Sequence, residues 1–343
     1  MLSDERRTYA GSELPGAVLL DEVVQYVFPM ALRTAAVLGV ADHLADGPMA
    51  VADLARLTGA DESSLHRTLR LLATKGIFQE DVRGRFALTE LAEPLRSSSP
   101  VSVRDGVIMI TDETLWRSVG ELPEAVRTGA PVFDRVFDMQ FFEHFAQNPA
   151  AAAEFDKGMA SFSAVEVQPV ADMCALPTDG TIIDVGGGQG GLLQTVLRDN
   201  PGLSGILVDQ EHVVTGHVLD TPEVAGRWSV EAGDFFDAVP AGDVYLIKRI
   251  LHDWDDDRCA RILANCRRAM RPGGRVLVVD AAIPPGNEPH HAKAIDVIML
   301  TLLPGRERTT EEFAPLFAAA GLRLTSITSV PGTTMSIMEG VAA

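Results

Sequence analysis

Three aspartates stand at the ends of three successive predicted strands, where their side chains could bind one ligand together. Asp184, Asp209 and Asp234 each follow a short run rich in β-branched and aliphatic residues. Open α/β sheets bind ligands at the carboxyl ends of their strands, so these carboxylates are expected to meet at one edge. Carboxylates accept hydrogen bonds from hydroxyl and amino groups and attract cations. The pattern therefore predicts a site for a polar small molecule.

A glycine-rich loop follows the first of these strands and opens a helix. Gly186, Gly188 and Gly191 fit the spacing G-x-G-x-x-G, in which missing side chains let the backbone approach a ligand. Asp209 follows Gly188 by 21 residues, as an acceptor for ribose hydroxyls would. This spacing permits either a nicotinamide dinucleotide or S-adenosylmethionine (SAM). Asp184 favours SAM, because a carboxylate opposes a pyrophosphate but suits an ammonium and a sulfonium.

Two further segments carry side chains suited to an adenine ring and to proton transfer. Asp234 and Phe235 end the third predicted strand, where a carboxylate can accept from an adenine amino group and an aromatic ring can pack on the base. The fourth predicted strand runs into Lys248, and His252 and Trp254 follow shortly after. Histidine exchanges protons near neutral pH, so His252 is the candidate general base.

The elements that must position these residues alternate between strands and helices. Short aliphatic runs predict strands buried on both faces at 181–185, 205–209, 230–234, 243–248 and 275–280. Helices are predicted at 191–199, 258–270 and 287–303, and two closing strands at 322–330 and 333–342. This alternation predicts an α/β domain with a Rossmann-like, doubly wound parallel sheet.

The N-terminal region has the pattern of a mostly helical, winged-helix-like domain. Predicted helices at 49–60 and 63–76 precede a predicted hairpin at 77–89. A winged helix can bind DNA, but the first 100 residues carry 10 Lys or Arg and 14 Asp or Glu. Because phosphate binding needs clustered positive charge, we expect this domain to pack against protein, including a second copy of itself.

The composition excludes several classes of protein. The chain of 343 residues carries 48 acidic and 29 basic residues, a net charge of −19, which disfavours binding to nucleic acids and to anionic membranes. Its three cysteines form neither a disulfide framework nor a zinc pattern, and no metal-ligand cluster is evident. The first 16 residues lack a secretory signal, and no apolar run could span a bilayer. We expect a soluble protein of the reducing cytoplasm.

The middle of the chain is predicted to be helical and is rich in aromatic residues. Five of its apolar side chains could sandwich a planar ligand or simply form a core: Phe141, Phe145, Phe155, Met159 and Phe162. The predicted organisation is therefore a winged-helix-like dimerisation domain at 17–100, a helical connector at 101–170 that contributes to an acceptor pocket, and a Rossmann-like catalytic domain at 171–343.

These motifs together resemble those of SAM-dependent O-methyltransferases, the family of the plant caffeic acid enzymes, acetylserotonin methyltransferases and actinobacterial enzymes that tailor antibiotics. The resemblance covers about residues 17–343 and rests on DVGGGQGG (184–191), VD (208–209), GDFF (233–236), LIKRILHDWDD (246–256), DVIML (296–300) and GRERTTEEF (305–313). It implies a homodimer formed through the N-terminal domain, SAM as cofactor and S-adenosylhomocysteine as its product.

The resemblance also implies roles for single residues. His252 matches the catalytic base, Glu307 matches one of two acidic residues that flank it, and Asp280 stands where the family has a second glutamate. The shorter side chain of Asp280 is expected to orient the base less directly or to contact substrate. The predicted cofactor-binding residues are Asp184, Gly186, Gly188, Asp209, Gly233, Asp234, Phe235, Lys248, Trp254 and Ser163. The predicted acceptor-binding residues are Phe141, Phe145, Phe155, Met159, Phe162, Asp253 and Met299.

The expected reaction is in-line methyl transfer, without a metal, to a hydroxyl group of an aromatic secondary metabolite, most simply a phenol. With an ordinary pKa near ~6.5, a neutral His252 would take the hydroxyl proton at neutral pH. Three alternatives remain open from the residues: a relative that binds SAM but decarboxylates or hydroxylates, a NAD-dependent dehydrogenase, and a ligand-sensing winged-helix regulator.

Overall fold

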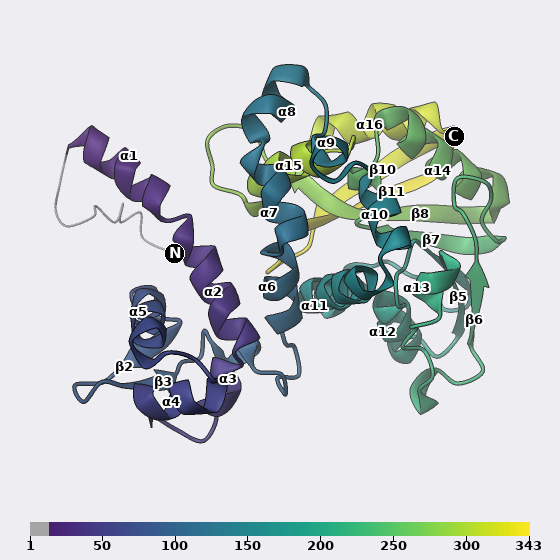
Figure 1. Cartoon of the computed structure of the whole chain (residues 1–343). Helices are drawn as coiled ribbons and strands as arrows, with labels where there is room; N and C mark the ends of the chain where they lie inside the picture. Colours follow the sequence, from purple (N-terminus) through teal and green to yellow (C-terminus); the bar gives the residue numbers. More distant parts are fainter. Residues whose placement is uncertain (1–13) are drawn as a thin grey trace. The chain divides into compact units, whose positions relative to one another are not determined.

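A computed structural model describes residues 14–343 and divides the chain into two compact units, Met1–Asp112 and Glu113–Ala343 (Figure 1). The predicted lack of a secretory signal concerns residues 1–16, of which 1–13 lie outside the described residues. Among the described helices, none combines the length and the apolar character that crossing a membrane requires.

The first unit contains the predicted winged-helix elements. Its helices are α1 (Pro15–Val24), α2 (Val27–Val37), α3 (Val40–His43), α4 (Val51–Thr58), α5 (Glu62–Ala73) and α6 (Arg104–Ile110), with a 3₁₀ turn, η2 (Glu93–Leu95). Its strands β1 (Met49–Ala50), β2 (Phe78–Glu80) and β3 (Arg85–Leu88) form a sheet in the order β1-β3-β2. Helix α5 begins where the Asp61 side chain accepts from the Ser64 amide at 2.9 Å, and it buries Leu65, Leu69 and Leu72 in this unit's core.

The second unit is built on one large sheet. Its strands are β4 (Gly180–Val185), β5 (Leu203–Asp209), β6 (Trp228–Ala232), β7 (Gly242–Lys248), β8 (Met270–Ile283), β10 (Leu322–Ser329) and β11 (Met335–Ala342), in the order β10-β11-β8-β7-β4-β5-β6. Strands β6, β5, β4, β7 and β8 run parallel, and β11 and β10 are antiparallel to their neighbours. The short strand β9 (Arg308–Thr309) pairs with β8.

One predicted feature of this sheet is wrong. The third predicted strand was expected to be buried on both faces, but β6 is an edge strand that leaves Glu231 and Ala232 exposed. It has a neighbour, β5, on one side only, so less of its surface is covered.

Helices cover both faces of the sheet, as the doubly wound prediction requires. Ile182 and Ile183 are adjacent in β4 but belong to different hydrophobic cores, because successive strand residues point to opposite faces. Helix α12 (Gly191–Asp199) packs in the first core and α14 (Asp256–Ala269) in the second. The other helices of this unit are α7 (Glu113–Gly120), α8 (Leu122–Thr128), α9 (Phe133–Phe137), α10 (Phe141–Gln147), α11 (Pro149–Met173), α13 (Glu211–Val214), α15 (His291–Leu302) and α16 (Thr310–Ala319), with 3₁₀ turns η3 (Pro222–Val224) and η4 (Leu251–Asp253).

The strand order reverses direction at β4, which lies between β5 and β7. The chain proceeds outward from β4 through β5 to β6, and then returns to β7 on the other side of β4. At such a reversal the crossover connections diverge and leave a crevice at the carboxyl ends of the strands. The predicted cofactor and base residues stand at those ends.

Candidate active site

His252 lies in the turn η4, directly after β7, and is held between two carboxylates. Its Nδ1 is 2.9 Å from Oε1 of Glu307, and its Nε2 is 3.5 Å from Oδ1 of Asp253. The ring is buried, and the backbone amide of Glu307 donates in turn to Asp296 at 2.9 Å. An ionised carboxylate can only accept, so Nδ1 carries the proton toward Glu307. Nε2 is then the atom that can take a proton from a substrate.

The carboxylates around His252 change its basicity. Burial of the ring lowers its pKa, but the negative charges of Asp253, Glu307 and Asp280 outweigh burial and raise the pKa to about 9. The sequence-based expectation of a ring that titrates near pH 6.5 is therefore wrong. A raised pKa favours the protonated ring in the free site and makes the neutral ring a stronger base.

Asp280 has no hydrogen-bonding partner for either carboxylate oxygen among residues 14–343. It lies in β8, is only 2% exposed, and makes no hydrogen bond to His252. Burial raises the pKa of its carboxyl group to about 7, against the attraction of His252. The shorter side chain of Asp280 therefore influences His252 through charge and not through a hydrogen bond, and its oxygens can still accept from a ligand.

The glycine-rich loop adopts conformations that need glycine. Gly186 has a φ of +66°, and a Cβ at this position would lie 2.5 Å from Cδ1 of Ile250. The amide of Gly188 donates to Asp209 at 2.8 Å, so this carboxylate holds the loop while keeping lone pairs for a ligand. Gly233, at the end of the next strand, donates its amide to the Asp209 carbonyl at 3.0 Å.

Asp184, which lies against Gly187 of this loop, interacts electrostatically with the buried Lys248. Burial raises the pKa of Asp184 to about 7, and its Oδ2 has no partner in the described part of the chain. Burial lowers the pKa of Lys248 to about 8, and its Nζ lies 2.5 Å from Oγ of Ser163. An orphaned buried carboxylate oxygen is a suitable acceptor for an ammonium group. Ser163 thereby joins the cofactor-binding candidates in space, although it belongs to α11.

A buried ion pair that the sequence reasoning missed lies beside these residues. Arg249 donates two hydrogen bonds to Glu166, at 2.7 and 3.0 Å, and its guanidinium lies over the ring of Phe162, 5.1 Å from the centroid. Arg249 has a φ of +55°, which is rare for a residue with a side chain. The sequence contained a signal for Glu166, because the spacing of Met159, Phe162 and Glu166 places all three on one face of α11.

The candidate adenine site is a cluster of aromatic rings. Trp254 packs edge-on against Phe236 at 4.8 Å and against Phe235 at 6.4 Å, and it stacks on Phe142 at 5.4 Å. Asp234 is exposed and accepts from the Phe236 amide at 2.8 Å. Phe142, from α10, was not among the predicted site residues, because its neighbour Phe141 has the same residue type and only the fold shows which ring meets Trp254.

The predicted acceptor-binding residues fall into two groups. Phe141, Phe145 and Phe155 contact one another, with ring centroids 4.4 to 5.7 Å apart, so they form a core cluster between α10 and α11. Phe162 instead contacts Arg249, and Asp253 contacts His252. Of the remaining two candidates, Met159 on α11 is half-buried and Met299 on α15 is buried.

Sequence comparisons place the chain among known enzymes. The profile of the O-methyltransferase domain matches residues 119–323, and that of the O-methyltransferase dimerisation domain matches residues 21–98. Phenazine O-methyltransferase PhzM of Lysobacter antibioticus is 40% identical over 318 residues, covering 92% of this chain and 93% of that protein. Aclacinomycin 10-hydroxylase RdmB of Streptomyces purpurascens is 33% identical over 341 residues, covering 95% and 90%.

A solved structure has a similar fold over most of the chain. The SAH-bound form of CalO1, a methyltransferase in calicheamicin biosynthesis, matches with a TM-score of 0.88 and 46% sequence identity. The match covers 97% of this chain and 99% of the CalO1 chain.

Proposed function

The chain belongs to the O-methyltransferase family, and we propose that it transfers the methyl group of SAM to a hydroxyl group of an aromatic intermediate in antibiotic biosynthesis. The observation that carries the proposal is the bond of 2.9 Å between His252 and Glu307, which leaves Nε2 to receive a proton beside Asp253. The family match argues against the dehydrogenase and regulator alternatives.

The basicity of His252 suits a phenol as acceptor. A phenol has a pKa of about 10, so it keeps its proton at neutral pH and needs a base. Asp253, Glu307 and Asp280 outweigh burial and raise the pKa of His252, which makes its neutral ring a stronger acceptor for that proton. Any cation that enters this pocket, including a sulfonium, would lower the pKa of the ring and favour its neutral form.

The mechanism divides the work between binding and proton transfer. SAM would supply a methyl group on a positively charged sulfur, which needs no acid to leave. His252 takes the proton of the acceptor hydroxyl at Nε2, and Glu307 holds the ring and stabilises the imidazolium. Asp253 lies beside Nε2 and is placed to orient the hydroxyl. His252 and Glu307 are buried, which limits their contact with water and strengthens these interactions.

The residues at the strand ends fit SAM. The orphaned Oδ2 of Asp184 can accept from an ammonium group, and Asp209 retains lone pairs for ribose hydroxyls. Phe235 and Trp254 lie where aromatic rings can pack on adenine. Lys248 and Ser163, which are hydrogen-bonded to each other, are the remaining proposed cofactor-binding residues. These roles, and an acceptor pocket that includes Phe162, Met159 and Met299, are part of the proposal.

A second candidate function is hydroxylation, because RdmB is a hydroxylase with related sequence. The retained His252–Glu307 pair favours methylation, since a base that accepts the hydroxyl proton serves methyl transfer directly.

We also propose a homodimer formed through the first unit. Helix α1 buries none of its residues: its Leu19, Leu20 and Val23, and Tyr26 just after it, are each more than 65% exposed. Exposed apolar side chains gathered on a helix that buries none of its residues indicate a protein–protein interface. The match to the dimerisation domain supports a second copy as the partner. A cytoplasmic location stays a prediction.

The proposal is tested with His252→Gln and a panel of phenolic acceptors. We expect normal SAM affinity by calorimetry and a loss of about 10²–10⁴-fold in kcat, the range for a general base. Full turnover by the variant would remove His252 from the mechanism. A hydroxylated product formed by the wild-type enzyme would favour the second candidate.

A further inference from the structure

We infer that Arg308 is a positioning residue, which fixes the backbone on both sides of His252 so that the ring faces Glu307. This inference rests on the proposed function only for its catalytic consequence, because the geometry concerns the protein alone. It assigns a role to the largest of the fully buried side chains in the described part of the chain.

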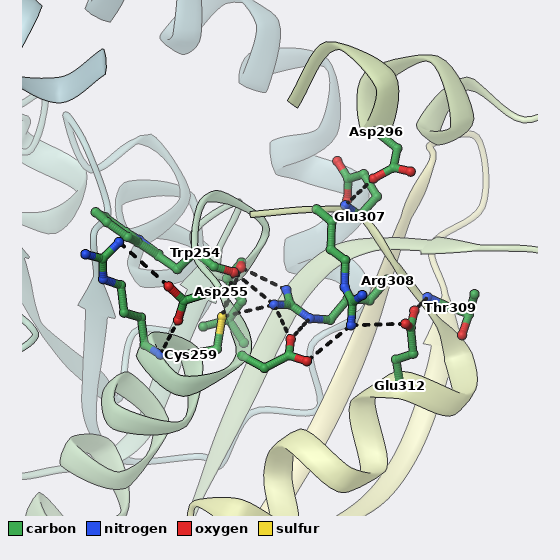
Figure 2. Close-up of polar contacts among 12 residues, drawn as sticks. Trp254, Asp255, Cys259, Asp296, Glu307, Arg308, Thr309 and Glu312 are labelled. Carbon is green, nitrogen blue, oxygen red and sulfur yellow. Dashed lines mark hydrogen bonds and ion pairs between the residues drawn. The ribbon is translucent and has the colours of Figure 1, made fainter. Parts of the chain in front are cut away.

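Arg308 holds the catalytic turn through its main chain. Nη1 donates to the carbonyl of Leu251 at 2.9 Å, directly before His252. Nη2 donates to the carbonyl of Trp254 at 2.9 Å, two residues after His252 (Figure 2). The Leu251 carbonyl also accepts from the Trp254 amide at 3.3 Å within the turn, so Arg308 adds a second bond to it, whereas the Trp254 carbonyl lies past the end of the turn. A guanidinium is a planar fork with fixed donor directions, so it sets the separation of these two carbonyls.

The clamp is reinforced from the helix that follows the turn. Arg308 donates to Oδ1 of Asp256 from Nε at 3.0 Å and from Nη2 at 2.7 Å, and it lies 3.4 Å from Sγ of Cys259. The Cys259 thiol itself lies 3.1 Å from the Leu251 carbonyl. Burial lowers the pKa of Arg308, but Cys259 and Asp256 raise it overall, so the charge is retained.

Arg308 is itself anchored to the rest of the fold. It pairs with Ala282 of β8, and the next residue, Thr309, begins α16 with a capping box in which its amide donates to Glu312 at 2.8 Å (Figure 2). The residue before Arg308, Glu307, forms the hydrogen bond to His252. One short rigid segment therefore holds His252 twice, by its side chain through Glu307 and by its backbone through Arg308.

Gly305 provides independent evidence that this segment and the turn are fitted to each other. A Cβ on Gly305 would lie 2.0 Å from the carbonyl oxygen of His252 and 2.5 Å from the amide nitrogen of Trp254. The two backbones therefore pass at a distance that no side chain permits. Because the two backbones touch, a displacement of the turn moves it away from the segment that carries Glu307. Such a movement lengthens the hydrogen bond between Nδ1 of His252 and Glu307.

The test uses Arg308→Lys, which keeps the positive charge but loses the fork, and Arg306→Met as the matched control. Arg306 also contacts Asp256, at 3.1 Å, but it is half exposed and no hydrogen bond joins it to a backbone carbonyl of the described chain. Asp256→Asn is a second variant at an exposed position, which weakens the clamp without emptying a buried site.

The primary measurement is the NMR titration of the ¹⁵N-labelled His252 ring in the absence of substrate. We expect Arg308→Lys to move the titration to lower pH, because the ring loses its hydrogen bond to Glu307, and Asp256→Asn to do the same to a smaller extent. We also expect kcat to fall about 10–100-fold, as for a misplaced catalytic group, and SAM affinity and the acceptor KM to change by a smaller factor than kcat does. The control should match wild type.

An unchanged His252 titration in folded Arg308→Lys would overturn the inference, as would an activity loss explained entirely by the unfolded fraction. A shifted titration in a protein that methylates no acceptor would support the positioning role and reject the proposed function instead.

Discussion

The carboxylate of Glu307 lies 2.9 Å from Nδ1 of His252, although 55 residues separate them in the chain. The two meet because η4 follows β7, and the segment that leads into β9 is fixed beside its neighbour β8. This relationship fixes the tautomer of the neutral His252 ring and, with Asp253 and Asp280, raises the pKa of His252 to about 9.

The pH dependence of the reaction should report this pKa. For a base whose pKa is raised, activity is low when the imidazolium dominates and rises as pH increases toward about 9. Glu307→Gln removes one negative charge, so the rise in kcat/KM should move to lower pH while kcat itself falls. A pH profile of kcat/KM from pH 6 to 10 measures both. An identical profile in the variant would contradict the electrostatic role of Glu307.

Asp280→Asn should make the protein more stable in mild alkali. Burial raises the pKa of Asp280 to about 7, so the folded state binds its proton more tightly than the unfolded state does. This contribution is present below the ordinary pKa near ~4 and is lost as pH rises through about 7. Asparagine does not ionise, so the variant avoids this loss of stability. We expect its free energy of unfolding to exceed that of the wild type by on the order of 1–3 kcal/mol at pH 8 and to equal it at pH 4. Urea denaturation at both pH values tests this.

The matched control is Asp220→Asn, which removes an equal charge from an exposed position. If this change stabilises the protein as much as Asp280→Asn, the effect comes from net charge and not from burial.

Glu166→Gln should destabilise the protein strongly. It leaves the buried Arg249 without its carboxylate, and breaking one partner of a buried pair costs about 3–5 kcal/mol. Asp199→Asn, in the half-exposed pair with Arg198, should cost less than about 1 kcal/mol. Denaturant titrations of both variants measure the difference. Similar losses would show that Arg249 finds another partner or water.

Gly186→Ala should impair SAM binding more than Gly188→Ala does. Both glycines have positive φ, so both variants incur backbone strain of about 1–2 kcal/mol. The new methyl group at 186 would also collide with Ile250 at 2.5 Å, whereas nothing lies within 4 Å at 188. Calorimetry with SAM compares the two. Equal losses would show that strain alone, and not the Ile250 contact, matters at this loop.

Leu19→Glu together with Leu20→Lys should dissociate the proposed dimer without unfolding the chain. Both side chains lie on α1 and are about two-thirds exposed, at 68% and 69%, so the charges add no burial cost in a free subunit. Sedimentation at several concentrations, with circular dichroism as the folding control, measures the result. A wild-type protein that is already monomeric would refute the dimer.

Much of this protein followed from its sequence, because the evidence there is local. The spacing of Gly186 and Gly188, the aliphatic strands and the position of His252 each depend on a few neighbouring residues. These features indicated the sheet, the loop and the candidate base, and Glu307 was added through resemblance.

Only the tertiary structure decided which distant groups meet and how far water is excluded from them. The pairing of Arg249 with Glu166, the clamp by Arg308 and the contact of Phe142 with Trp254 each join separate elements. The same reason explains why the basicity of His252 was mispredicted. A pKa depends on burial and on charges several ångströms away, and strands far apart in the chain bring those charges together.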